Sequence, residues 1–114
     1  DHNPQALIVA VEPSDSPVLS GGEPGPHKIQ GIGAGFVPDV LNTEIYSRII
    51  TVSNEEAMLS ARDLARDDGI FVGISAGANV FAARQVAAQL NPEQNVVTIL
   101  CDTGERYLTT NIFD

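Results

Sequence analysis

A serine between two glycines is the most informative short motif in this sequence. The segment Gly73-Ile-Ser-Ala-Gly77 precedes a helical pattern, which places Ser75 and free backbone N–H groups at the positive end of a helix. The spacing resembles the nucleophile elbow of hydrolases, but no histidine follows Ser75 to complete a catalytic triad. Two interpretations remain, a ligand contact or an ordinary helix N-cap, and the local sequence alone favours the cap.

A second glycine-rich segment, Gly31-Ile-Gly-Ala-Gly35, has the spacing G-x-G-x-G rather than that of a dinucleotide fingerprint. No strand pattern immediately precedes it, so its context also differs from that fingerprint. Three glycines permit positive φ angles or the close approach of backbone to a ligand. The residues alone leave a ligand-binding loop and a tight structural loop equally open.

Polar residues also follow the strongest predicted strand of the chain. Asp102 and Thr103 come after residues 95–101, at the end of a predicted strand, which is where ligands bind in open α/β sheets. Cys101 is predicted to be a small buried side chain. The next residues, Glu105 to Tyr107, could instead form a surface pairing that fixes the end of the chain.

Lys28 is the only lysine, so it is the only amine side chain of this sequence that could form a Schiff base. Its neighbours Pro26 and His27 suggest no apolar pocket, and we predict a surface or loop residue. No metal site is predicted.

The elements that must position these residues follow from hydrophobic patterning. Residues 7–11, 48–52 and 95–101 are short runs rich in β-branched residues and are predicted to be strands, the last of them central in a parallel sheet. Residues 13–42 hold most of the prolines and glycines and form a long loop, whether ordered or flexible.

Two helices are predicted between the second and third strands. Ser53 and Glu56 form a capping-box pattern, with Ala57, Ala61, Leu64 and Ala65 on one face and Gly69 as the C-terminal signal. The second helix extends over about residues 75–90 with Ala78, Phe81, Ala82 and Val86 inward. Strands and helices in this order predict an α/β fold with a parallel sheet flanked by helices.

Composition narrows the functional class. The 114 residues carry a formal net charge of −9, which argues against a nucleic-acid partner. With one cysteine no intrachain disulfide can form, which fits the cytoplasm. No apolar run is long enough to span a membrane, and no signal peptide is evident. A start at Asp1 without methionine suggests that an upstream part is missing.

Three motifs taken together resemble one family. Residues 27–36, 73–78 and 103–108 are similar, in order and spacing, to the C-terminal third of cysteine synthase (O-acetylserine sulfhydrylase). The connecting segments 11–17, 24–26 and 53–57 agree as well, so the resemblance covers essentially the whole chain.

The resemblance implies a fold-type-II, tryptophan-synthase-β-like enzyme that depends on pyridoxal 5'-phosphate. Residues 1–114 would be the C-terminal portion of its larger cofactor-binding domain. The family is homodimeric and forms L-cysteine from O-acetyl-L-serine and sulfide, and the C-terminal tail of serine acetyltransferase is a candidate partner. The Schiff-base lysine and the phosphate-binding turn would lie upstream, so the resemblance implies no catalytic residue in this chain and no activity of the chain alone.

Residue by residue, the resemblance assigns Ser75 to the pyridine nitrogen of the cofactor and places Asp102 and Thr103 near the ring edge. The substrate loop is identified as Gly31, Ile32, Gly33 and Ala34.

Two departures leave the amino-acid substrate open: Cys101-Asp-Thr replaces a segment where proline and serines are common, and the loop at Ser20 to Pro24 is short. Cystathionine β-synthase, serine/threonine dehydratase and a non-catalytic module that kept the fold are the alternatives.

Overall fold

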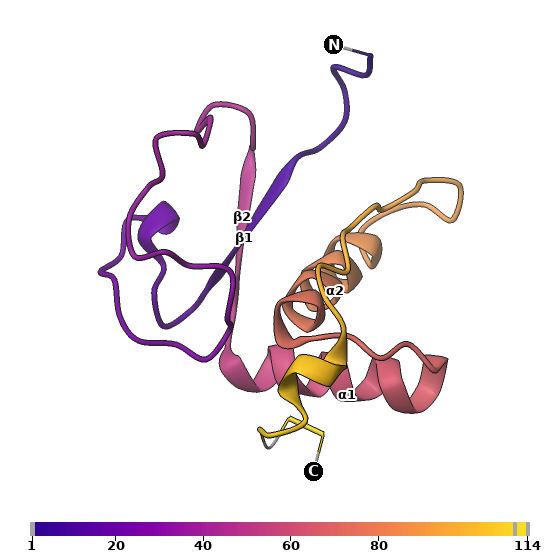
Figure 1. Ribbon diagram of the computed structural model, residues 1–114. Helices are drawn as coiled ribbons and strands as arrows, with labels where there is room; N and C mark the ends of the chain where they lie inside the picture. Colours follow the sequence, from indigo (N-terminus) through magenta and orange to yellow (C-terminus); the bar gives the residue numbers. More distant parts are fainter. Residues whose placement is uncertain (1, 111, 114) are drawn as a thin grey trace.

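The computed structural model describes residues 2–110, 112 and 113, and Figure 1 shows their arrangement. The elements follow one another as β1 (Val9–Pro13), the 3-10 turn η1 (Val18–Ser20), β2 (Arg48–Val52), α1 (Asn54–Asp68), α2 (Ile74–Ala87) and the 3-10 turn η2 (Gly104–Tyr107). The predicted α/β class is therefore confirmed.

The sheet of the described residues is a parallel pair in which Val9 lies opposite Arg48 and Pro13 opposite Val52. Strand β2 has the predicted bounds. Strand β1 begins and ends two residues later than predicted, because the Glu12-Pro13 step does not break it. Proline is tolerated there since the Ser14 N–H, not that of position 13, donates to the Val52 carbonyl (2.8 Å).

Helix α1 has both predicted ends. The Ser53 hydroxyl accepts from the Glu56 N–H (3.1 Å), and the Glu56 carboxylate accepts from the Ser53 N–H (2.8 Å), which completes a capping box. Gly69 ends the helix in the left-handed conformation. Ala57, Ala61 and Leu64 are buried as predicted, Ala65 is half-buried, and Ser60 joins the buried face.

Helix α2 lies between α1 and the two strands (Figure 1). Its N-terminal half is buried on every side, because small side chains let neighbouring backbones approach closely. A Cβ at Gly77 would overlap the carbonyl oxygen of Ala57 in α1. The helix ends at Ala87 rather than near Leu90, and the last three predicted residues continue as single turns.

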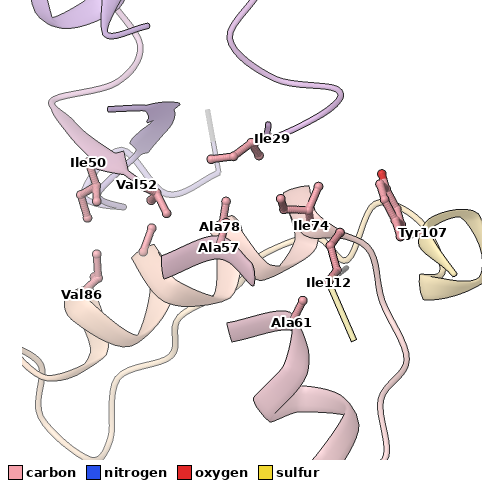
Figure 2. Close-up of a cluster of buried hydrophobic side chains, with 11 residues drawn as sticks. Ile29, Ile50, Val52, Ala57, Ala61, Ile74, Ala78, Val86, Tyr107 and Ile112 are labelled. Atoms are coloured by element: carbon pink, nitrogen blue, oxygen red, sulfur yellow. The ribbon is translucent and has the colours of Figure 1, made fainter. Parts of the chain in front are cut away.

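The core joins both helices to β2. Ile50 and Val52 point toward α2, which carries Ala78 and Val86 facing them (Figure 2). Ile29, from the loop before the glycine-rich segment, is fully buried in the same cluster. Among the residues that the structure describes, no helix is long and apolar enough to cross a membrane.

The prediction of a third strand at residues 95–101 is wrong for this structure. The segment has no regular secondary structure and pairs with no described strand, and Val97 and Ile99 are 89% and 70% exposed. A strand requires a neighbouring backbone edge, and no described segment forms a ladder with this one. Cys101, predicted to be buried, is exposed for the same reason.

The contact between the helices yields a stability prediction. Gly77→Ala should lower the free energy of unfolding by about 1 kcal/mol, because overpacking against the α1 backbone costs about 1–3 kcal/mol. The better helix propensity of alanine offsets about 1 kcal/mol of that. Denaturant unfolding measures the difference, and Gln85→Ala on the exposed side of α2 is the control, expected within about 0.5 kcal/mol of the parent. Equal or greater stability of Gly77→Ala would contradict the close approach.

Candidate functional site

The N-terminus of α2 provides the first part of the site. Gly73, not Ser75, is the N-cap residue, and no side chain caps the helix. The interpretation of Ser75 as an N-cap is therefore wrong. Ser75 lies within the first turn and is 4% exposed, beside backbone N–H groups that have no partner inside the helix. These donors and the helix dipole favour an electron-rich ligand atom.

Asp102 provides the second part. Its Oδ2 accepts from the Tyr107 hydroxyl (2.7 Å) and, at 3.4 Å, from the exposed Arg106 guanidinium. Its Oδ1 is buried and has no hydrogen-bond partner among the described residues. A buried carboxylate oxygen without a partner is unfavourable, so Oδ1 is available to accept from a bound group.

Gly73 brings these two parts together. Its N–H approaches the Asp102 carbonyl (3.4 Å), and a Cβ at this position would overlap both Asp102 Oδ1 and the Tyr107 ring. An antiparallel bridge between Val72 and Thr103 holds the two segments side by side. The structure thus places Asp102 and Thr103 next to the start of α2. Asp102 packs against Gly73, which precedes Ser75 by two residues.

Tyr107 is 3% exposed, so the interpretation of residues 105–107 as a purely surface pairing is wrong for this side chain. Burial raises the pKa of Tyr107 to about 12, and the hydrogen bond to Asp102 and the charge of that carboxylate act in the same direction. The neutral hydroxyl therefore remains a donor to Asp102 across the physiological pH range.

The glycine-rich segment forms a separate, ordered loop. Gly31, Gly33 and Gly35 all have positive φ angles (96°, 64° and 85°), as three glycines permit. Since the Ile29 N–H donates to His27 Nδ1 (3.1 Å), His27 Nε2 carries the proton and donates to the Gly33 carbonyl (2.9 Å). This imidazole holds the loop in its conformation.

A cavity of about 470 Å³ lies against this loop and is lined by residues 31–36 together with Val11, Glu12, Ser16 and Leu19. Glu12 is 3% exposed, and its carboxylate accepts from the N–H groups of Leu19 (2.8 Å) and Ser20 (2.9 Å). The buried Glu12 carboxylate therefore holds this part of the cavity wall in place through hydrogen bonds from the nearby backbone of Leu19 and Ser20.

Sequence reasoning missed the structural roles of Glu12 and His27. The position of Glu12 directly after an apolar strand is a signal for its buried structural role. Nothing in the sequence shows that His27 would fold back onto Gly33. Lys28 is exposed, as predicted for a loop or surface residue, and its N–H donates to the Asn54 side chain (2.9 Å).

A buried hydroxyl, unpaired N–H groups and an unpartnered carboxylate oxygen around one helix end suit a polar aromatic ring such as that of a pyridoxal cofactor. The described part of the chain brings together no group of three or more His, Cys, Asp and Glu side chains that could bind a metal ion.

Residues 1–102 match the family described as pyridoxal-phosphate dependent enzyme, and the chain belongs to that family. It is similar to a cysteine synthase of Staphylococcus aureus, with 56% identity over 110 residues. That match covers 96% of this chain and 36% of the relative, so the chain spans about a third of the relative's length.

Solved structures of related enzymes have the same fold as this chain. A cysteine synthase of Entamoeba histolytica superposes with a TM-score of 0.92 at 41% identity, covering 98% of this chain and 33% of that one. An O-acetylserine dependent cystathionine β-synthase of Helicobacter pylori gives a TM-score of 0.89 at 40% identity, covering 96% and 36%. These likenesses confirm the predicted fold-type-II class.

The Asp102–Tyr107 pair yields a pH prediction. The sequence has two tyrosines, so Tyr46→Phe leaves Tyr107 as the one phenol to titrate. Phenolate absorbance should then develop near pH 12 rather than near the ordinary value of about 10. Because the folded pKa lies above the unfolded one, this contribution to stability is complete below about pH 10 and is lost as the pH rises toward 12.

Asp102→Asn in the Tyr46→Phe background is the comparison variant. It removes the carboxylate, and the titration midpoint should move down while staying above 10, since burial is the larger cause. A midpoint that stays near 12 in the folded Asp102→Asn variant would contradict the pairing.

Proposed function

We propose that this chain is the C-terminal portion of the cofactor-binding domain of a cysteine synthase, which makes L-cysteine from O-acetyl-L-serine and sulfide. The observation that carries the proposal is the buried Ser75 at the uncapped start of α2, next to the unpartnered Oδ1 of Asp102. The 56% identity to a cysteine synthase supports the particular activity.

Ser75 is the residue we assign to the ring nitrogen of pyridoxal phosphate, with Asp102 and Thr103 at the adjacent ring edge. When bound, the cofactor withdraws electrons from the amino-acid Cα and so makes loss of the β-substituent possible. A neutral hydroxyl does not hold a proton on the ring nitrogen as a carboxylate does. Ser75 therefore keeps electron withdrawal moderate, which favours prompt β-elimination.

The ring nitrogen stays unprotonated only if the Asp102 carboxylate does not contact it. The contacts of Asp102 support a position at the ring edge instead. Tyr107 fixes Oδ2, and the Asp102 side chain lies packed against Gly73. We assign Tyr107 as a positioning residue that holds the carboxylate at the ring edge.

Gly31, Ile32, Gly33 and Ala34 are proposed to contact the amino-acid substrate. Exposed Gly31 and Ala34 leave backbone groups accessible beside the cavity, while Ile32 packs on the core and His27 holds Gly33. A loop held at its middle can present N–H groups to a substrate without collapsing into the cavity.

The wider proposal is a cytoplasmic homodimer to which the C-terminal tail of serine acetyltransferase can bind. Its support is the family resemblance. The Helicobacter pylori relative keeps O-acetylserine dependent cystathionine β-synthase as the second candidate, which would exchange sulfide for a larger thiol.

The role of Ser75 is tested in the full-length enzyme. Ser75→Ala should preserve the fold, change the visible absorbance of the bound cofactor and slow cysteine formation by about 10–100-fold, by analogy with hydrogen-bonding partners that orient and tune a bound metal ligand. Ser75→Asp should hold the ring nitrogen protonated and shift the spectrum further. Ser60→Ala, a buried serine on α1, is the matched control. Parent-like spectra and turnover in both Ser75 variants would limit Ser75 to a packing role.

A second prediction concerns the 114 residues by themselves. The exposed Lys28 has no desolvating pocket that would activate its amine, so the chain should form no specific covalent linkage with pyridoxal phosphate. Borohydride reduction followed by peptide mapping measures this, with Lys28→Arg as the control for nonspecific labelling. Stoichiometric labelling of Lys28 would contradict the prediction.

A further inference from the structure

The two ring nitrogens of His27 have different roles in hydrogen bonding. Nδ1 accepts from the Ile29 N–H (3.1 Å), so it carries no proton, and Nε2–H donates to the Gly33 carbonyl (2.9 Å). Only the neutral imidazole with its proton on Nε2 makes both bonds. His27 therefore links the chain at Ile29 to the middle of the glycine-rich loop.

The chain around His27 is fixed by contacts outside that loop. The Lys28 N–H donates to the side chain of Asn54, the first residue of α1 (2.9 Å). Ile29 is fully buried in the core cluster (Figure 2). Since α1 and the core hold the residues that follow it, the imidazole is a fixed point to which a loop can be attached.

Gly33 is the point of attachment. It has a φ angle of 64°, and a Cβ at this position would overlap both the ring of the buried Pro13 and His27 Nε2. A Cβ at Gly31 would meet nothing within 4 Å, and one at Gly35 would make only an ordinary van der Waals contact. Of these three glycines, Gly33 alone lies between the end of β1 and the imidazole.

The bond to Gly33 also fixes the direction of the next N–H group. The Gly33 carbonyl and the Ala34 N–H belong to one planar trans peptide, so they point in opposite directions. The Ala34 N–H is therefore turned away from His27, and it donates to no acceptor among the described residues. Gly33 and Ala34 line the cavity of about 470 Å³, whereas His27 does not. This N–H is thus available to a molecule bound in the cavity.

We infer that His27 is a positioning residue for the amino-acid substrate. It acts through Gly33, because holding that carbonyl keeps the Ala34 N–H directed at an acceptor oxygen of O-acetyl-L-serine. The inference rests on the proposed function and deepens it by naming the side chain that keeps the substrate loop in its binding conformation. A loop that is already ordered loses less conformational entropy when the substrate binds.

Two substitutions separate the two hydrogen bonds of His27. His27→Asn keeps the bond from the Ile29 N–H, because its amide oxygen is as many bonds from Cα as Nδ1, but it is too short to reach Gly33. Asn3 and Asn42 already accept in this way from the N–H two residues later (3.1 and 3.0 Å). His27→Gln does the reverse, since its amide nitrogen is as many bonds from Cα as Nε2 and can donate to Gly33.

Both variants are made in the full-length enzyme, with His2→Asn as the matched control at the other histidine of the sequence. The first measurement is independent of activity. His27→Asn should release the loop, so chymotrypsin should cleave after the exposed Phe36 at least about tenfold faster than in the parent, because cleavage requires local opening. His27→Gln and His2→Asn should be cleaved at the rate of the parent.

The second measurement is steady-state kinetics. In His27→Asn, kcat/KM for O-acetyl-L-serine should fall about tenfold through a higher KM, as expected when about a tenth of the molecules have the loop in place. The kcat at saturating substrate should stay within about twofold of the parent, since ordering the loop contributes to binding rather than to the chemical step. His27→Gln should restore the KM of the parent.

Parent-like cleavage and kinetics in His27→Asn would overturn the inference, and so would equal effects of the two His27 variants. Faster cleavage with an unchanged KM would overturn it as well, because the loop would then be held without positioning the substrate. Circular dichroism checks folding. If His27→Asn does not fold, a tenfold higher KM in folded His27→Gln, which keeps the Gly33 bond, contradicts the inference.

Failure of the proposed function gives a different result. A full-length parent enzyme that forms no cysteine rejects the proposed activity. The cleavage rates of the two His27 variants then still decide whether His27 holds the loop.

Discussion

The close contact of α2 with its neighbours determines where Ser75, Asp102 and Thr103 lie. At Gly77 the helix touches the α1 backbone, and at Gly73 it meets Asp102 and Tyr107, so two glycines fix its position at adjacent turns. The N-terminal half is buried and consists mainly of small residues. Dense packing makes such a helix rigid, and its first turn, with Ser75 and free N–H groups, is held in a defined place without a capping side chain.

The same packing explains why a carboxylate can sit at this helix end with one oxygen unpartnered. Asp102 gains a charge-assisted bond from the buried Tyr107 hydroxyl, and it lies near the positive end of α2. These interactions offset the desolvation of Oδ1. Arg106 adds little, because its guanidinium is 70% exposed and 3.4 Å away.

Local signals in the sequence identified the elements whose stability is local. The capping box at Ser53 and Glu56, the left-handed Gly69 and strand β2 were all predicted, since each depends on nearby residues. The positive φ angles of the glycine loop also follow from residue type. The bond from His27 to Gly33 and the burial of Tyr107 depend on tertiary contacts, which no periodicity in the sequence encodes. The roles of Ser75, Asp102 and Thr103 in binding the cofactor came from the resemblance and stay predictions.

The failed strand prediction at residues 95–101 reflects a different limit. The residues have the composition of a central strand, yet pairing is a property of two segments and the sequence of one cannot guarantee it. Their apolar side chains are as ill suited to water as the pattern indicates, yet Val97 and Ile99 are exposed because no strand pairs with this segment. The pattern is therefore informative about side-chain type rather than about pairing, because residues 95–101 have the side chains of a central strand without the strand partners.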